Sequence, residues 1–135
     1  MLNVERNADP SGRPRQVRDI GERTLAYGVR AVRLFRALQE SSDRAGWVIG
    51  KQFLRSATSI GANVTEARAG ESRKDFVHKL QIAQKEARES LYWLRLLAEA
   101  EVTAPSRLRG ITRETDELVA ILTAITRNAK RNSAR

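Results

Sequence analysis

A run of 31 residues from Glu71 to Glu101 contains neither glycine nor proline, which predicts one long, unbroken helix. Placed at about 100° per residue, its apolar side chains fall on two stripes. The first stripe comprises Phe76, Leu80, Ala83, Ala87, Leu91, Leu94 and Ala98. The second comprises Ile82, Trp93 and Leu96, and Glu86 and Glu89 lie between the two stripes. One stripe is enough to pack a helix into its own bundle, so the second indicates a contact with another chain.

The remaining sequence predicts three further helices, and the four together predict an all-α, antiparallel up-down four-helix bundle. The predicted helices span residues 17–39, 43–69, 72–101 and 105–128. Connections of about three to six residues favour antiparallel neighbours. Residues 1–16, which include two prolines and a glycine, are expected to form a disordered leader, and residues 129–135 a basic tail.

The first predicted helix is apolar over more than half of its circumference, which fits a helix with neighbours on two sides. Its main stripe comprises Ile20, Leu25, Val29, Val32, Phe35 and Leu38, and Tyr27, Ala31 and Leu34 widen it. The fourth predicted helix has a single stripe, which comprises Leu108, Ile111, Thr115, Leu118, Leu122 and Ile125.

Three glycines, Gly46, Gly50 and Gly61, interrupt the second predicted helix, and each should cost about 1 kcal/mol relative to alanine. Close approach of a neighbouring helix, at a point where a Cβ would collide, offsets that cost. A break or kink near Gly46 is the alternative. Ser41, Ser42 and Asp43 are expected to supply a turn and the N-cap of this helix, and Gly70 its end.

The second predicted helix also carries an unusual run of small polar residues, RSATSIGANVTEA, at residues 55–67. Serine, threonine and asparagine are mediocre inside helices because their side chains offer the backbone other hydrogen bonds. These residues either hydrogen-bond within closely packed helices or form a ligand or partner site. That site would centre on Arg55, Ser59 and Asn63, which follow one another at i, i+4 and i+8 on one face.

The chain is strongly basic, with 25 lysines and arginines against 16 acidic residues and a net charge of +9. The excess lies in the first two predicted helices and the tail, whereas residues 71–101 hold six residues of each sign. A net charge of this size favours polyanionic partners, although a run of basic residues is often only a helix face in contact with solvent. Aromatic side chains that could stack on bases are scarce, so binding should be to the backbone or to duplex shape. The candidate nucleic-acid-binding residues are Arg23, Arg30, Arg33, Arg36, Arg127, Lys130 and Arg131.

Catalytic and metal chemistry have little support in this sequence. The chain has no cysteine and one histidine, His78, which excludes thiol catalysis and any metal site built from two imidazoles. Glu86 and Glu89 lack the Glu-x-x-His spacing of di-metal bundles and are expected to pair with arginines. No glycine-rich phosphate loop is present. We therefore expect no enzymatic activity, no catalytic residue, no cofactor and no metal.

The second stripe of the long helix supplies the expected oligomer contact. His78 lies on the flank of that stripe, one turn before Ile82. The residues expected at the interface are His78, Ile82, Glu86, Glu89, Trp93 and Leu96. The sequence has no long apolar segment and no signal-like hydrophobic core, which predicts a soluble, cytoplasmic protein without a membrane partner.

Residues 54–97 resemble the bacterial four-helix-bundle proteins encoded in intervening sequences of 23S ribosomal RNA genes. The matching motifs are RSATSIGANVTEA (55–67), SRKDFVHKL (72–80), KEARES (85–90) and YWLRLL (92–97). A weaker match extends the resemblance to roughly residues 17–125. The resemblance implies a left-handed up-down bundle that assembles as a ring-like homopentamer, and it implies no catalytic residue. The family is similar in build to the accessory protein of diversity-generating retroelements, a basic pentamer that binds nucleic acid and a reverse transcriptase.

Two functional hypotheses follow from the sequence. The first is a non-enzymatic, oligomeric, basic bundle that binds the backbone of RNA or DNA. The second is a protein–protein adaptor or scaffold, for example an accessory subunit for a reverse transcriptase. They differ in the residues that matter, because neutralising Arg30, Arg33 and Arg131 should abolish function only under the first hypothesis. Changes in the face between Arg55 and Asn63 should abolish it under the second.

Overall fold

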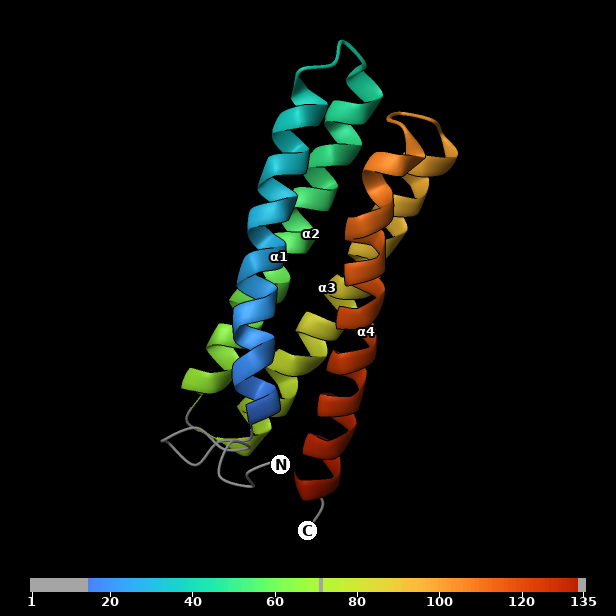
Figure 1. The fold of residues 1–135 in the computed structure, drawn as a ribbon. Coiled ribbons are helices and arrows are strands. Elements are labelled where there is room, and N and C mark those ends of the chain that lie inside the picture. The colour runs from blue at the N-terminus through green and yellow to red at the C-terminus, as the bar shows by residue number, and fades with distance from the viewer. Residues whose placement is uncertain (1–14, 71, 134–135) are drawn as a thin grey trace, which may run out of the picture.

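The computed structural model describes residues 15–70 and 72–133, and these residues form four helices (Figure 1). The helices are α1 (Arg15–Gln39), α2 (Arg44–Ala69), α3 (Arg73–Glu99) and α4 (Pro105–Ser133). Successive helices run in opposite directions, so α1 begins and α4 ends at the same end of the bundle. The predicted all-α, antiparallel up-down four-helix bundle is therefore confirmed. Its predicted left-handed sense stays a prediction.

The fourth helix is longer than its sequence pattern predicts. It continues through Ser133 instead of ending near residue 128, because buried Ala129 adds one more turn to the inward stripe after Ile125. Residues 129–133 of the expected basic tail therefore belong to α4. The remaining tail residues, 134–135, and residues 1–14 of the expected leader lie outside the described part of the chain.

Side-chain caps fix where α2 and α3 begin. The Asp43 carboxylate accepts hydrogen bonds from the backbone N–H groups of Ala45 (2.9 Å) and Gly46 (3.3 Å), which satisfies donors that have no partner inside the helix. The Ser72 hydroxyl accepts from the backbone N–H of Asp75 at 3.1 Å in the same way. Gly46 thus lies in the first turn of an unbroken α2, and the alternative of a break there is wrong.

The glycines of α2 lie where neighbouring segments come very close. A Cβ on Gly61 would be 3.2 Å from the carbonyl oxygen of Thr24 in α1, and one on Gly50 would be 3.1 Å from Cδ1 of Leu38. A Cβ on Gly46 would be 2.5 Å from Cγ1 of Val102, in the connection before α4. The absence of side chains at Gly50 and Gly61 therefore lets α1 and α2 pack closely.

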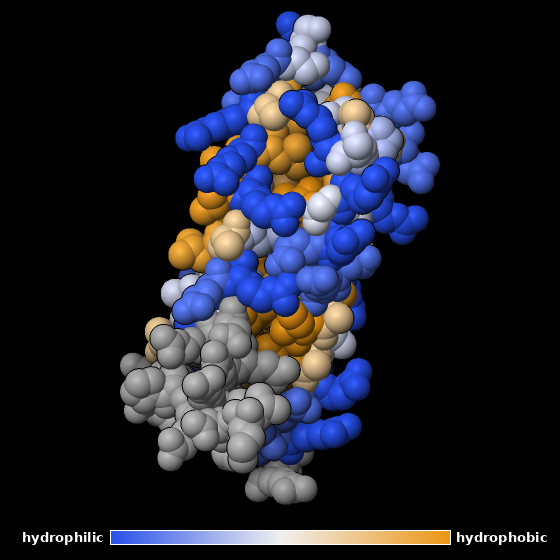
Figure 2. All heavy atoms as spheres, in the orientation of Figure 1, coloured by the Kyte–Doolittle hydropathy of each residue, from blue (hydrophilic) through white to orange (hydrophobic). Residues whose placement is uncertain are grey.

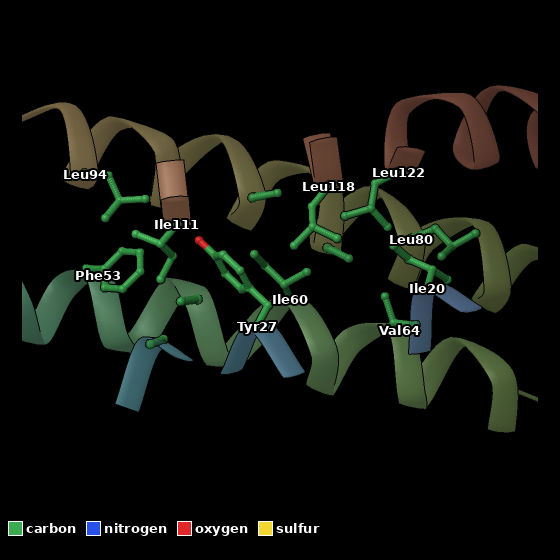
Figure 3. Packing of buried hydrophobic residues seen from close by; sticks show 14 of the residues in the cluster. Ile20, Tyr27, Phe53, Ile60, Val64, Leu80, Leu94, Ile111, Leu118 and Leu122 are labelled. Carbon is green, nitrogen blue, oxygen red and sulfur yellow. The ribbon is translucent and has the colours of Figure 1, made fainter. Parts of the chain in front are cut away.

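The core is a single cluster to which all four helices contribute (Figure 3). In α1, Tyr27 and Ala31 face this core, whereas Leu25, a member of the predicted stripe, is 72% exposed. That part of the sequence-based interpretation is wrong, because an apolar arc wider than half the helix does not reveal which of its sides faces the core. The largest fully buried side chains include Ile20, Tyr27, Phe53, Ile60, Leu80, Leu94, Leu97, Leu108, Leu118 and Leu122.

A layer of buried hydroxyl groups crosses this core, one from each helix. The Thr115 hydroxyl donates to the carbonyl of Ile111 at 2.7 Å, so the Tyr27 hydroxyl is the donor in its 2.6 Å bond to Thr115. Ser56 and Ser90 form a second bond across the core, at 2.8 Å. Burial raises the pKa of Tyr27 to about 12, although its hydrogen bonds to Thr115 and Ser90 oppose the shift. Because these bonds join different helices, they favour one mutual register.

Candidate functional site

A groove lies between α1 and α4, which pack less closely against each other than α1 packs against α2. Its volume is about 330 Å³. Figure 2 shows hydrophobic atoms deep in this seam with hydrophilic side chains on both sides. The groove therefore combines an apolar floor with a charged rim. Its lining residues are Arg30, Arg33, Leu34, Ala37, Arg107 and Ile111.

Helical spacing and a glycine position the basic side chains of this groove. Arg30 and Arg33 are three residues apart on α1, so both project to the side that faces α4. Arg107 lies in the first turn of α4, which begins at Pro105. A Cβ on Gly110 would lie 3.0 Å from Nη2 of Arg30. The guanidinium of Arg30 therefore rests directly against the α4 backbone.

The arginines along this seam differ in whether a carboxylate neutralises them. Arg23 bonds Glu114 (2.9 Å) and Glu117 (2.7 Å) of α4, and the hydrogen bond to Glu114 is the main reason that the pKa of Arg23 is raised. Within residues 15–70 and 72–133, no carboxylate pairs with Arg30, Arg33 or Arg107. Three uncompensated positive charges thus surround the groove, whereas Arg23 is already engaged.

The other predicted basic residues lie elsewhere. Arg36 is in the last turn of α1, and Lys130 and Arg131 are in the last turn of α4, where positive charge stabilises the end of a helix. Lys130 also lines a cavity of about 860 Å³ at the end of the bundle, with Arg73, Lys74 and His78. Lys130 follows Arg107 by 23 residues in the same helix, or about 35 Å along its axis. Arg127 is exposed.

The polar run of α2 and the expected oligomer face of α3 meet in one cluster between these two helices. Arg55 of α2 bonds Glu86 (3.5 Å) and also Glu89 of α3. Trp93 Nε1 donates to the Glu89 carboxylate at 3.0 Å. The expected pairing of these two glutamates with an arginine therefore occurs within the chain.

The remaining polar residues of the run in α2 are mostly satisfied by their own helix. The side-chain amide of Asn63 donates to the carbonyl and the hydroxyl oxygen of Ser59, at 2.8 and 3.0 Å. Thr58 and Thr65 each donate to a carbonyl one turn earlier. Of this run, Ser56 is the residue whose hydroxyl reaches a neighbouring helix, at Ser90.

The expected oligomer face of α3 is only partly exposed. Ile82, Trp93 and Leu96 are all intermediate in burial, and Trp93 packs against the core, while His78 is exposed. Tyr92, which the two-stripe pattern does not include, is 58% exposed and forms an edge-on contact with Trp93, with ring centroids 5.1 Å apart. Other large exposed apolar side chains are Leu25 and Val29 in α1, and Trp47 and Val48 in α2.

Sequence reasoning missed Arg107 and Gly110, which complete the groove. Residues 102–126 hold three basic and three acidic residues, so no local charge excess marks Arg107. Only the packing of α4 beside α1 brings it to Arg30 and Arg33. A glycine inside the helical pattern, Gly110, was the available signal, because such a glycine often marks a close approach.

In residues 15–70 and 72–133, no three His, Cys, Asp or Glu side chains gather in a way that could hold a metal ion. No helix of that part of the chain has the length and apolar character needed to span a bilayer.

The fold and the site define a basic, all-helical bundle with an arginine-lined groove and no described metal centre. The chain belongs to the 23S rRNA-intervening sequence protein family, whose sequence pattern matches residues 26–124. It is also similar to a protein with unknown function from the S23 ribosomal protein family of Bacteroides thetaiotaomicron, known from a crystal structure. The two are 38% identical with a TM-score of 0.76, over 83% of this chain and 98% of that one. No curated protein matches the chain.

Proposed function

We propose that this protein is a non-enzymatic, oligomeric helical bundle that binds the phosphate backbone of nucleic acid through Arg30, Arg33 and Arg107. The main support for this proposal is the groove between α1 and α4, where these three guanidinium groups have no carboxylate partner among the described residues. Guanidinium groups bind phosphate oxygens through two parallel hydrogen bonds. The net charge of +9 adds long-range attraction for a polyanion.

Binding of labelled RNA and DNA, measured by fluorescence anisotropy at rising salt concentration, tests the proposal. Phosphate contacts release counterions, so the logarithm of the binding constant should fall linearly with the logarithm of salt concentration. Binding of single strands, duplexes and hairpins should all be tried. If none of them binds at about 50 mM salt, where phosphate contacts are strong, the proposal fails.

Assembly into a homo-oligomer is part of the proposal, and the pentameric number rests on the family resemblance alone. Leu25, Val29 and Tyr92 support it, because each is a large apolar or aromatic side chain that this chain leaves exposed. A ring would also bring several grooves within reach of one nucleic acid, which raises the overall affinity. The proposal includes a cytoplasmic location, where RNA is abundant.

A protein–protein adaptor is the second candidate, and the cluster of Arg55, Tyr92 and Trp93 favours it. Tyrosine, tryptophan and arginine are the residues that most often dominate the binding energy of protein interfaces. Beside this cluster, Tyr92, Arg95, Leu96 and Glu99 line a cavity of about 300 Å³. As an adaptor, the protein should co-purify with a reverse transcriptase encoded beside its gene, and Tyr92→Ala should abolish this. Substitution of Arg30 and Arg33 should leave that interaction intact.

A further inference from the structure

We infer that the groove between α1 and α4 takes a single nucleic-acid strand and not a duplex. The inference rests on the proposed function and specifies its ligand. In this arrangement, the phosphates on either side of one nucleotide bond Arg30, Arg33 and Arg107. The sugar and base lie against the apolar floor formed by Leu34, Ala37 and Ile111.

The size of the groove is the first argument. Its volume of about 330 Å³ is at the lower end of the range for small-molecule sites, which is about 300–1,000 Å³. One nucleotide can occupy a volume of this size, whereas a duplex, whose major groove alone is about 12 Å wide, is too large for it. A duplex can therefore rest across the rim of such a groove, but it cannot enter it.

The apolar floor is the second argument. A duplex holds the faces of its bases inside its own stack and presents mainly phosphates to a protein. Contact with a duplex would leave Leu34 and Ala37 facing water. An unpaired base can be buried against apolar side chains, and the planar guanidinium groups of the arginines provide surfaces for stacking.

The neighbouring carboxylates are the third argument, because they limit how far along the seam a polyanion can extend. Glu114 and Glu117 lie on α4 beside Arg23. Arg23 precedes Arg30 by seven residues, or about 10 Å along α1. The carboxylates neutralise Arg23 and repel further phosphates, so the basic site ends on the side towards Arg23. A site bounded in this way suits one nucleotide with its two flanking phosphates better than the extended charge track of a duplex backbone.

A binding experiment with the full chain separates the strand types. The probes are a fluorescent twelve-residue oligouridine, which forms no stable duplex with itself, and a fluorescent RNA hairpin of equal phosphate number. Anisotropy is measured at about 50 mM salt, where phosphate contacts are strong. We expect the single strand to bind at least about tenfold more tightly than the hairpin, because burial of an unpaired base against the apolar floor adds to the phosphate contacts.

The substitution Ala37→Leu tests the groove itself. It fills the apolar floor without changing any charge, so it should weaken oligouridine binding by about fivefold or more and leave hairpin binding unchanged. Ala62→Leu is the matched control, because Ala62 is exposed on α2 and away from the groove. Circular dichroism confirms that both variants are folded.

Each outcome of this experiment has a distinct meaning. If neither probe binds, the proposed function fails. If the hairpin binds as tightly as oligouridine or more tightly, nucleic-acid binding stands and the inference of a single strand is overturned. The inference is also overturned if Ala37→Leu and Ala62→Leu bind oligouridine equally well, because the strand then lies outside the groove.

Discussion

Replacing Gly61 by alanine tests the close approach of α1 and α2. Inside a helix, alanine is about 1 kcal/mol more favourable than glycine, so the exchange stabilises a protein wherever there is room. At Gly61, the new Cβ would lie 3.2 Å from the carbonyl oxygen of Thr24, a backbone atom that cannot rotate away. Overpacking of this kind costs about 1–3 kcal/mol. Gly61→Ala should therefore change stability by between zero and about −2 kcal/mol.

The matched control is Gly28→Ala in α1, where a Cβ would meet no atom of the described residues within 4 Å. This variant should raise the free energy of unfolding by about 1 kcal/mol. Urea denaturation followed by far-UV circular dichroism measures both variants against the parent protein. If Gly61→Ala stabilises as much as Gly28→Ala, the two helices do not approach each other at Thr24, and the account of these glycines is refuted.

Three further predictions concern the buried hydroxyl groups and the exposed apolar side chains. Because burial raises the pKa of Tyr27 from 10.0 to about 12, the unfolded chain loses this proton first. The contribution of Tyr27 to the free energy of unfolding is therefore complete below pH 10 and falls by about 1.4 kcal/mol per pH unit towards pH 12. The free energy of unfolding of Tyr27→Phe, measured by denaturation over the same pH range, should lack this decline. Thr126→Val should stabilise the folded protein by about 1 kcal/mol, because the buried Thr126 hydroxyl has no hydrogen-bond partner among the described residues. Thr115→Val should destabilise it by about 1–3 kcal/mol, because it removes a buried hydroxyl that bonds Tyr27 and Ile111. Equal effects of the two substitutions would contradict this reasoning. If the chain assembles through α1, Leu25→Lys should lower the mass measured by light scattering while far-UV circular dichroism at 25 °C shows the helices intact, and an unchanged mass argues against that interface.

The sequence predicted the helices well because their signals are local. The run from Glu71 to Glu101 has nothing to interrupt a helix, and Asp43 and Ser72 cap their helices through bonds that span two or three residues. The end of α4 was harder to predict. Its last turns hold basic residues that also suit a solvated tail, and the burial of Ala129 depends on the rest of the bundle.

The candidate site could be predicted only in part, because it depends on which helices become neighbours. The charge pattern singled out Arg30 and Arg33, but it included Arg23 equally, and only the position of Glu114 in the fold distinguishes them. Arg107 joins the groove through the packing of α4 beside α1. Periodicity identifies a face of a helix, whereas the identity of its neighbour is a property of the whole fold.

The central claim is that the groove arginines contact phosphates, and the salt dependence of binding tests it most directly. The triple variant Arg30→Gln, Arg33→Gln, Arg107→Gln is compared with a control triple variant in which three exposed basic residues outside the groove are changed. The control changes are Arg44→Gln, Lys85→Gln and Arg88→Gln. Both variants lower the net charge by three, from +9 to +6, so long-range attraction is equal.

The measurement is the slope of the logarithm of the oligouridine binding constant against the logarithm of salt concentration. Each phosphate contact on a single strand contributes about −0.7 to this slope. Loss of two contacts should therefore flatten the slope of the groove variant by about 1.4 for each groove that the strand occupies. The control variant should keep the slope of the parent protein. Equal slopes for the two variants would contradict the account.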